Sequence, residues 1–160
     1  MARKTQVDET DIAIIRKLQA DGRRPYSDIA AELDLAPSTI QQRANRLIDL
    51  RLIKVRAVTD PIALGVPVTA QIGIKVDGIR MREAAVDISQ FDEVGYVVIC
   101  TGRYDILIEV ACRDNDHLLT FISDRLARVE GVRNTEVLIY LRIVKNTYQW
   151  GVPDYDAAQS

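Results

Sequence analysis

A short polar stretch in the first third of the chain has the composition of a surface that binds a polyanion. Residues 34–47 read "DLAPSTIQQRANRL", and the apolar residues Ile40, Ala44 and Leu47 recur at the spacing of one helix face. The positions between them carry hydroxyls, amides and guanidinium groups, and none of residues 38–46 is acidic. Because phosphates would repel a carboxylate on this face, its absence favours contact with nucleic acid.

The outward side chains of this predicted helix have the chemistry that reads bases. Glutamine can form two hydrogen bonds with adenine, arginine can do so with guanine, and hydroxyls bind phosphates or either kind of base. Two more basic residues, on the segment after the helix, would contact the DNA backbone from a wing. The predicted DNA-binding residues are Ser38, Thr39, Gln42, Arg43, Arg46, Lys54 and Arg56.

The elements expected around this stretch occur in the order of a winged helix-turn-helix. A first helix covers about residues 8–20, a second follows the capping residue Ser27, and a third begins at Pro37. Alternating apolar residues over 53–57 predict a strand after them. A polar helix face alone is more often an ordinary solvated surface, but this order of elements favours a recognition helix.

The second half of the chain predicts a separate domain. Its elements follow the order βαββαβ of a ferredoxin-like fold, at residues 68–76, 80–90, 94–101, 106–112, 115–130 and 135–145. The fold class is therefore α+β. Four parts are expected: a winged helix-turn-helix domain at 1–59, a linker at 60–67, an effector-binding and oligomerisation domain at 68–145, and a C-terminal tail at 146–160.

Two strands of this predicted domain, residues 94–101 and 135–145, are apolar on both faces. Both helices of a βαββαβ unit pack on the same face of the sheet, so the other face would be left exposed. Because a large exposed apolar patch usually marks an interface, the pattern predicts a dimer that forms sheet to sheet.

The turn "TGRYD", residues 101–105, gathers groups that could bind an amino acid. Asp105 could hold an ammonium group, while Arg103 or the backbone amides near Gly102 could hold a carboxylate through charge-assisted hydrogen bonds. The alternative is a plain hairpin turn in which Asp105 bonds to its own backbone.

Composition separates the two halves and excludes several functions. Residues 1–58 carry 11 basic and 8 acidic side chains, whereas residues 59–160 carry 10 and 15, so only the first half is basic. A hairpin register that places Cys100 opposite Leu107 keeps Cys100 and Cys112 too far apart for a disulfide. The sequence predicts no secretory signal and no membrane span, so we expect a cytoplasmic protein.

No residue pattern indicates an enzyme. The only histidine, His117, lies in the first turn of a predicted helix beside Asp114 and Asp116, where a solvated side chain is the simplest interpretation. The sequence contains no nucleophile motif, no glycine-rich phosphate loop and no HExxH. We therefore predict a protein that is not an enzyme and has neither a cofactor nor a metal site.

From Val7 to about residue 145, the chain resembles the Lrp/AsnC family of bacterial and archaeal transcription regulators, also called feast/famine regulators. The resemblance lies in "VDETDIAIIRKLQADGRRPYSDIAAELDLAPSTIQQRANRLIDLRLI" for the DNA-binding domain, "AVTDPIALG" for the linker strand, "GRYD" for the Gly-x-Tyr-Asp turn, and "VEGVRNTEVLIYL" for the last helix and strand. The chain departs from the family at Asp34, Ala36 and Arg51, where glycine, serine and glycine are frequent. Arg51 would then need a left-handed conformation.

The resemblance implies a DNA-binding regulator with a RAM-type effector domain and dimers that assemble further, often into octamers. It also implies a pocket between subunits at the turn, with residues from the start of the last strand nearby. Arg103 stands where an acidic residue is frequent, which would favour a ligand with more negative charge or a keto acid. The candidate effector-binding residues are Thr101, Gly102, Arg103, Tyr104, Asp105, Arg133, Thr135 and Glu136.

The expected partners are double-stranded DNA, further copies of the chain, and an amino acid or related metabolite as effector. One alternative is an architectural DNA-binding protein without an effector. Another is a protein-interaction domain that does not touch DNA, which a salt titration would separate because phosphate binding weakens as salt rises.

Overall fold

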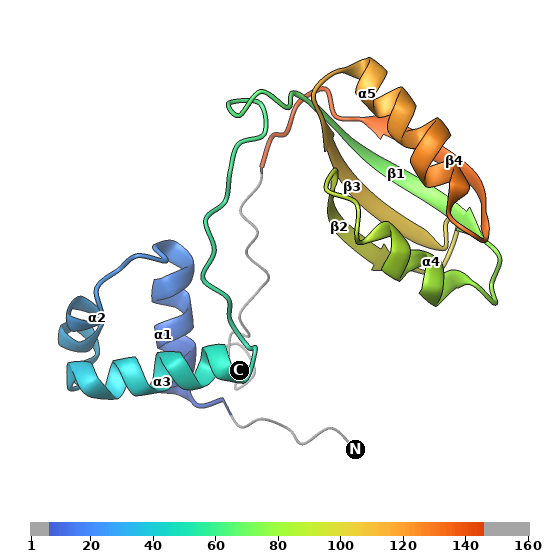
Figure 1. Cartoon of the computed structure of the whole chain (residues 1–160). Coiled ribbons are helices and arrows are strands. Elements are labelled where there is room, and N and C mark those ends of the chain that lie inside the picture. Colours follow the sequence, from blue (N-terminus) through green and yellow to red (C-terminus); the bar gives the residue numbers. More distant parts are fainter. Residues whose placement is uncertain (1–6, 146–160) are drawn as a thin grey trace. The chain divides into compact units, whose positions relative to one another are not determined.

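The computed structural model describes residues 7–145, which form two compact units that divide after Val58. The first unit contains three helices, and the second contains a four-stranded antiparallel sheet with helices on one face (Figure 1). This is the α+β class predicted from the sequence. The tail expected at 146–160 lies outside the described residues. None of the described helices is long and apolar enough to cross a bilayer.

The helices of the first unit are α1 (Glu9–Ala20), α2 (Tyr26–Leu33) and α3 (Pro37–Asp49). Asp8 caps α1, because its side chain accepts a hydrogen bond of 2.8 Å from the N–H of Asp11, whose carboxylate accepts the N–H of Asp8 at 3.4 Å. The three helices share one core, formed by Ile14, Leu18, Ile29, Ala30, Ile40, Ala44 and Leu47. The pair α2–α3, joined by three residues, is the predicted helix-turn-helix.

Two residues with positive φ stand on either side of α3. Asp34, which ends α2, has a φ of 52°, and Arg51, two residues beyond the end of α3, has a φ of 58°. The positive φ of Arg51 confirms the left-handed conformation predicted for it. Residues with a Cβ atom rarely adopt this conformation. At the start of α3, Pro37 occupies the first position while Ala36 supplies no side-chain cap.

The strand predicted at residues 53–57 does not form. The segment has no regular secondary structure, and Ile53 alone packs against the helical core while Val55 and Val58 are exposed. A strand needs a neighbour to satisfy its backbone groups, and residues 7–58 contain no other strand. The helix-turn-helix is therefore confirmed, but the wing expected to carry Lys54 and Arg56 is wrong for the single chain.

The sheet of the second unit has the strand order β2-β3-β1-β4. Its strands are β1 (Val68–Val76), β2 (Val94–Ile99), β3 (Ile106–Cys112) and β4 (Val132–Ile139). Its helices are α4 (Met81–Ile88) and α5 (Asn115–Thr120), and α5 is continued by the π-helix η1 (Phe121–Arg125) and the 3-10 helix η2 (Leu126–Arg128). Every second residue of β1 and β3 is buried against α4 and α5, which lie on the same face of the sheet (Figure 1). The predicted βαββαβ order is confirmed, although β4 ends six residues earlier than expected.

The register of the β2–β3 hairpin differs from the predicted one by two residues. Val98 lies opposite Leu107, and the N–H of Cys100 donates to the carbonyl of Asp105 at 2.9 Å, whereas the sequence argument paired Cys100 with Leu107. The turn is therefore longer than expected and comprises residues 101–104. Both cysteines are nevertheless free thiols, as predicted.

Candidate functional site

Helix α3 presents its polar side chains at two levels of exposure. Ser38, Gln42 and Asn45 are exposed and lie four and three residues apart, so they form one row, here called the exposed row. Thr39 and Arg43 are half-buried beside the apolar stripe. The prediction missed Asn45, although its spacing from Gln42 was a signal that could have found it.

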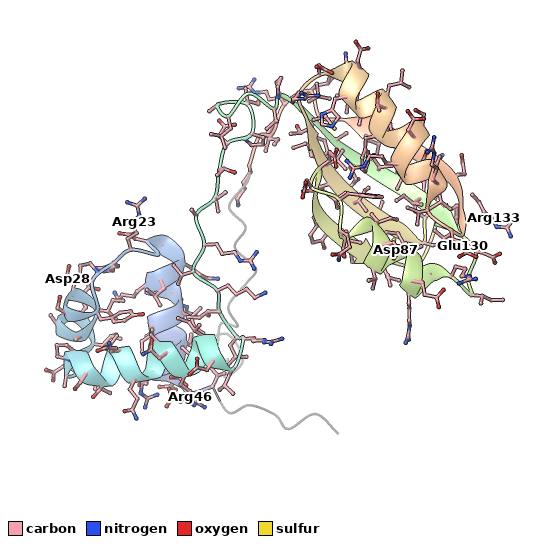
Figure 2. The ribbon with its side chains drawn as sticks, viewed as in Figure 1. Arg23, Asp28, Arg46, Asp87, Glu130 and Arg133 are labelled. Atoms are coloured by element: carbon pink, nitrogen blue, oxygen red, sulfur yellow. The ribbon has the colours of Figure 1, made fainter. Side chains whose placement is uncertain are left out.

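Two carboxylates at the start of α1 hold the arginines of α3. Nη1 of Arg43 donates to the two oxygens of Asp8 at 2.9 and 2.7 Å and to Oδ1 of Asp11 at 2.9 Å. Nη1 of Arg46 donates to Oδ2 of Asp11 at 3.0 Å. We call these four residues the Asp8–Arg43 cluster. With Gln42 they line a surface hollow of about 450 Å³, and Figure 2 shows Arg46 on α3 close to where the chain enters α1.

The electrostatics of this cluster fit a set of stable ion pairs. The hydrogen bond from Arg43 and the N–H of Asp11 lower the pKa of the Asp8 carboxyl. The same contacts with Asp8 and Asp11 raise the pKa of Arg43. The side chain of Asp11 is only 1% exposed, so the two arginines take the place of water as partners of this carboxylate.

The remaining predicted DNA contacts lie on the irregular segment after α3. Lys54 and Arg56 are both exposed there. Without a strand around them, their side chains are accessible to a phosphate backbone but are not held at a fixed spacing from the exposed row.

In the second unit, the absence of a side chain at Gly73 lets Tyr104 lie on the sheet. A Cβ atom at Gly73 would be 2.7 Å from the Tyr104 ring. The Tyr104 hydroxyl donates to Oε2 of Glu136, the residue opposite Gly73 on β4, and Nη2 of Arg103 donates to the same oxygen at 2.7 Å. The hydrogen bond to the Glu136 carboxylate raises the pKa of Tyr104. Arg103, Tyr104 and Glu136 are called the Arg103–Glu136 cluster below.

The carboxylate of Asp105 already has partners within the chain. Its Oδ2 accepts the N–H of Val76 at 3.1 Å and its Oδ1 accepts Nζ of Lys75 at 3.1 Å. These two bonds, the backbone one first, lower the pKa of Asp105. Lys75 also reaches the carbonyl of Gly102 at 3.3 Å. The geometry is close to the plain-turn alternative, except that the bonded backbone belongs to β1 rather than to the turn.

Three other predicted effector residues lie apart from the Arg103–Glu136 cluster. Arg133, labelled in Figure 2, donates through Nη2 to Asp77 at 2.9 Å. Thr135 pairs with Ile74 on β1, which places its side chain on the helix-covered face of the sheet. Thr101 is exposed in the turn. The structure therefore brings together only part of the predicted effector set.

The face of the sheet opposite α4 and α5 mixes apolar and polar side chains. Tyr96 and Leu138 are exposed on the two outer strands of this face. Between them, the hydroxyl of Tyr140 donates to Oε1 of Glu109 at 2.9 Å. Large apolar groups left in water beside satisfied polar groups are typical of a protein interface.

Comparisons with known proteins match both units. The AsnC-type helix-turn-helix domain matches residues 7–48, and the Lrp/AsnC ligand binding domain matches residues 69–150. An uncharacterized HTH-type transcriptional regulator of Pyrococcus abyssi is 36% identical over 151 residues, which are 94% of this chain and 93% of that protein.

Solved structures agree with these matches. AsnC from E. coli is 27% identical, with a TM-score of 0.79 over 88% of this chain and 96% of that one. A transcriptional regulator from Neisseria meningitidis, solved in complex with L-Met, shares the fold at 24% identity, with a TM-score of 0.83 over 95% and 99% of the two chains. These relatives are transcription regulators rather than enzymes. The chain belongs to the Lrp/AsnC family and is a transcriptional regulator with a helix-turn-helix DNA-binding domain and a ligand-binding domain.

Proposed function

We propose that this regulator recognises a specific DNA sequence through α3 and that an amino acid, or a related metabolite, controls its assembly or its DNA affinity. The observation that carries the DNA part is the exposed row, which offers a hydroxyl and two amides and no carboxylate. Thr39 and Arg46 flank this row, and Lys54 and Arg56 supply phosphate contacts. Such a protein works on the genome, so we assign it to the cytoplasm.

The Arg103–Glu136 cluster supplies the effector chemistry. The side chains of Arg103 and Glu136 are 76% and 38% exposed, so their ion pair can open without leaving a buried charge. An amino acid carries a carboxylate for Arg103 and an ammonium group for Glu136, so both partners would remain paired after binding. A keto acid would leave the Glu136 carboxylate without a cationic partner, with only the Tyr104 hydroxyl bonded to it. The pair therefore favours an amino acid over the keto acid that Arg103 alone suggested, and Asp105 fixes the turn instead of holding the ammonium group.

A dimer through the open face of the sheet fits this proposal. Tyr96 and Leu138 would leave water on that face, and a two-fold dimer would present two α3 helices to the DNA. We expect a pseudo-palindromic site whose half-sites lie about one helical turn apart, or a multiple of it. Assembly of dimers into octamers is the step that the effector would change through different affinities for the two states.

A ligand screen with matched variants tests the effector proposal. Thermal unfolding of the full chain is measured with each amino acid and its keto acid, and the hits are repeated by light scattering and DNA binding. Arg103→Gln and Glu136→Gln should each abolish the shift. Arg128→Gln is the control, because Arg128 is 78% exposed in the same unit and should leave the shift unchanged. No hit would support the architectural DNA-binding alternative, and a hit that both site variants retain would move the effector site away from the Arg103–Glu136 cluster.

A further inference from the structure

We infer that the carboxylates of the Asp8–Arg43 cluster hold Arg43 as a positioning residue, so that the exposed row, and not Arg43, reads the bases. Arg43 has the side chain that most often reads guanine, and it lies on the recognition helix. Its contacts, burial and place on the helix nevertheless assign it to the junction between α1 and α3.

The buried carboxylate of Asp11 makes this junction costly to open. The side chain of Asp11 is almost fully buried, and it accepts hydrogen bonds from Arg43 and Arg46. If Arg43 left, the buried Asp11 carboxylate would keep only Arg46 as a cationic partner, and removing part of the compensation of a buried charge is destabilising. A single guanine contact supplies less than that loss, so Arg43 stays with the carboxylates when DNA binds.

One nitrogen of the Arg43 guanidinium group, Nη1, is already hydrogen-bonded to carboxylates of the same unit. Its Nη1 faces three carboxylate oxygens, two from Asp8 and one from Asp11, at distances between 2.7 and 2.9 Å. A fork-like contact with guanine needs two neighbouring N–H groups that point into the major groove. The three bonds of Nη1 instead direct that end of the guanidinium group to the carboxylates at the start of α1.

The position of Arg43 along α3 agrees with these contacts. It lies three residues after Ile40 and four before Leu47, both fully buried, so it borders the core-facing stripe. Gln42 lies on the exposed row beside Ser38 and Asn45, on the side that a major groove would meet. The cluster thus fixes how α3 sits on α1, and that angle sets the depth at which the row enters the groove.

Selection from random DNA tests this assignment. The wild-type full chain selects duplexes from a random-sequence library, and binding is then measured on the selected duplex and on a scrambled duplex of the same composition. Gln42→Ala should lose roughly tenfold on the selected duplex and much less on the scrambled one. Arg43→Gln and Asp8→Asn should weaken binding to both duplexes by similar factors. The double variant should be no weaker than Arg43→Gln, because the two residues act as one unit.

A conservative variant separates positioning from reading. Arg43→Lys keeps a positive charge for Asp8 and Asp11 but lacks the planar fork, so it should select the same sequence and bind it within about threefold of wild type. A reader of guanine would instead lose about tenfold or more in discrimination and select a site without that base. That result would overturn the assignment, whereas a wild-type chain that enriches no sequence would overturn the proposed function on which the assignment rests. Arg43→Lys also serves if Arg43→Gln fails to fold.

Discussion

The two units each carry an arginine–carboxylate cluster on the surface where a partner is expected, but the clusters differ in burial. In the first unit, the carboxylate of Asp11 is 1% exposed and two arginines hold it. In the second, Arg103 and Glu136 are 76% and 38% exposed. A buried ion pair loses several kcal/mol when one partner is removed, whereas an exposed pair contributes little. The same residue types therefore fix a helix in one unit and leave a replaceable pair in the other.

This difference matches the ligands expected at the two surfaces. DNA is a rigid polyanion whose groove must meet α3 at a set angle, so a fixed helix junction helps binding. A small zwitterion must instead displace the ion pair between Arg103 and Glu136. Because this exposed pair contributes little to the free energy of folding, a weakly binding ligand can displace it. If the first cluster is structural and the second is exchangeable, matched variants of the two clusters should differ in their effect on the free energy of unfolding.

The largest expected effect is the loss of the buried carboxylate. Asp11→Ala should destabilise the first unit by about 3 kcal/mol, because it removes the common partner of two arginines and part of the α1 cap. Hydrogen exchange of the α1 and α3 amides measures this loss unit by unit. Glu136→Ala, the matched change in the second unit, should cost less than about 1 kcal/mol. Equal losses would remove the contrast between the two clusters.

In the second unit, a steric change beneath the Tyr104 ring should reduce the free energy of unfolding more than the loss of the Arg103–Glu136 ion pair does. Gly73→Ala places a Cβ atom where the Tyr104 ring lies, so we expect a loss of about 1–3 kcal/mol from the second unit, measured by urea unfolding. Gly95→Ala is the control, since nothing lies within 4 Å of a Cβ at Gly95. Combining Gly73→Ala with Tyr104→Ala should recover much of the loss caused by overlap. A double variant that is simply additive would contradict this explanation.

The first cluster should also appear in the pH dependence of stability. Because the folded pKa of Asp8 is lowered, its contribution is present above the unfolded value of about 3.9 and is lost as the pH falls through the folded value. Asp8→Asn should therefore cost about 1 kcal/mol or less at pH 7, since Asp8 is half exposed, and should flatten the profile below about pH 4. Unfolding midpoints between pH 2 and 7 measure this. A profile that Asp8→Asn leaves unchanged would contradict this role of Asp8.

The smallest expected effect on stability belongs to Arg103. Arg103→Gln should change the unfolding free energy by less than about 0.5 kcal/mol without a ligand, because its ion pair is exposed. Calorimetry of the unliganded full chain checks this value. A loss above about 1 kcal/mol would make the Arg103–Glu136 pair structural, and the two clusters would then be of one kind.

The sequence predicted the elements whose evidence is local. Helical spacing around Ile40 and Leu47, the cap at Asp8 and the alternation from Val68 to Val76 each lie within a few residues of the element they define. The strand at 53–57 had the same kind of local signal and failed, because strand formation also requires a partner strand and residues 7–58 contain none.

The details of both sites depend on contacts between distant residues. The hairpin register was wrong because the turn has four residues and its Tyr104 lies over Gly73, and no local rule of turn length contains that contact. The pairing of Arg43 with Asp8 joins residues 35 positions apart, which periodicity could not predict. One signal was available, since Arg43 borders the buried stripe and therefore could not point straight outward.

Substitutions at the two left-handed residues beside α3 would change the thermal stability of the protein without changing the DNA sequence that it recognises. Asp34 and Arg51 hold a backbone conformation that glycine adopts without cost, and neither belongs to the exposed row or to the Asp8–Arg43 cluster. Glycine at position 51 would recover about 1 kcal/mol without altering a groove-facing side chain. A lineage that moved to a warmer or colder habitat could therefore adjust this protein at positions 34 and 51 while its binding sites across the genome stayed valid.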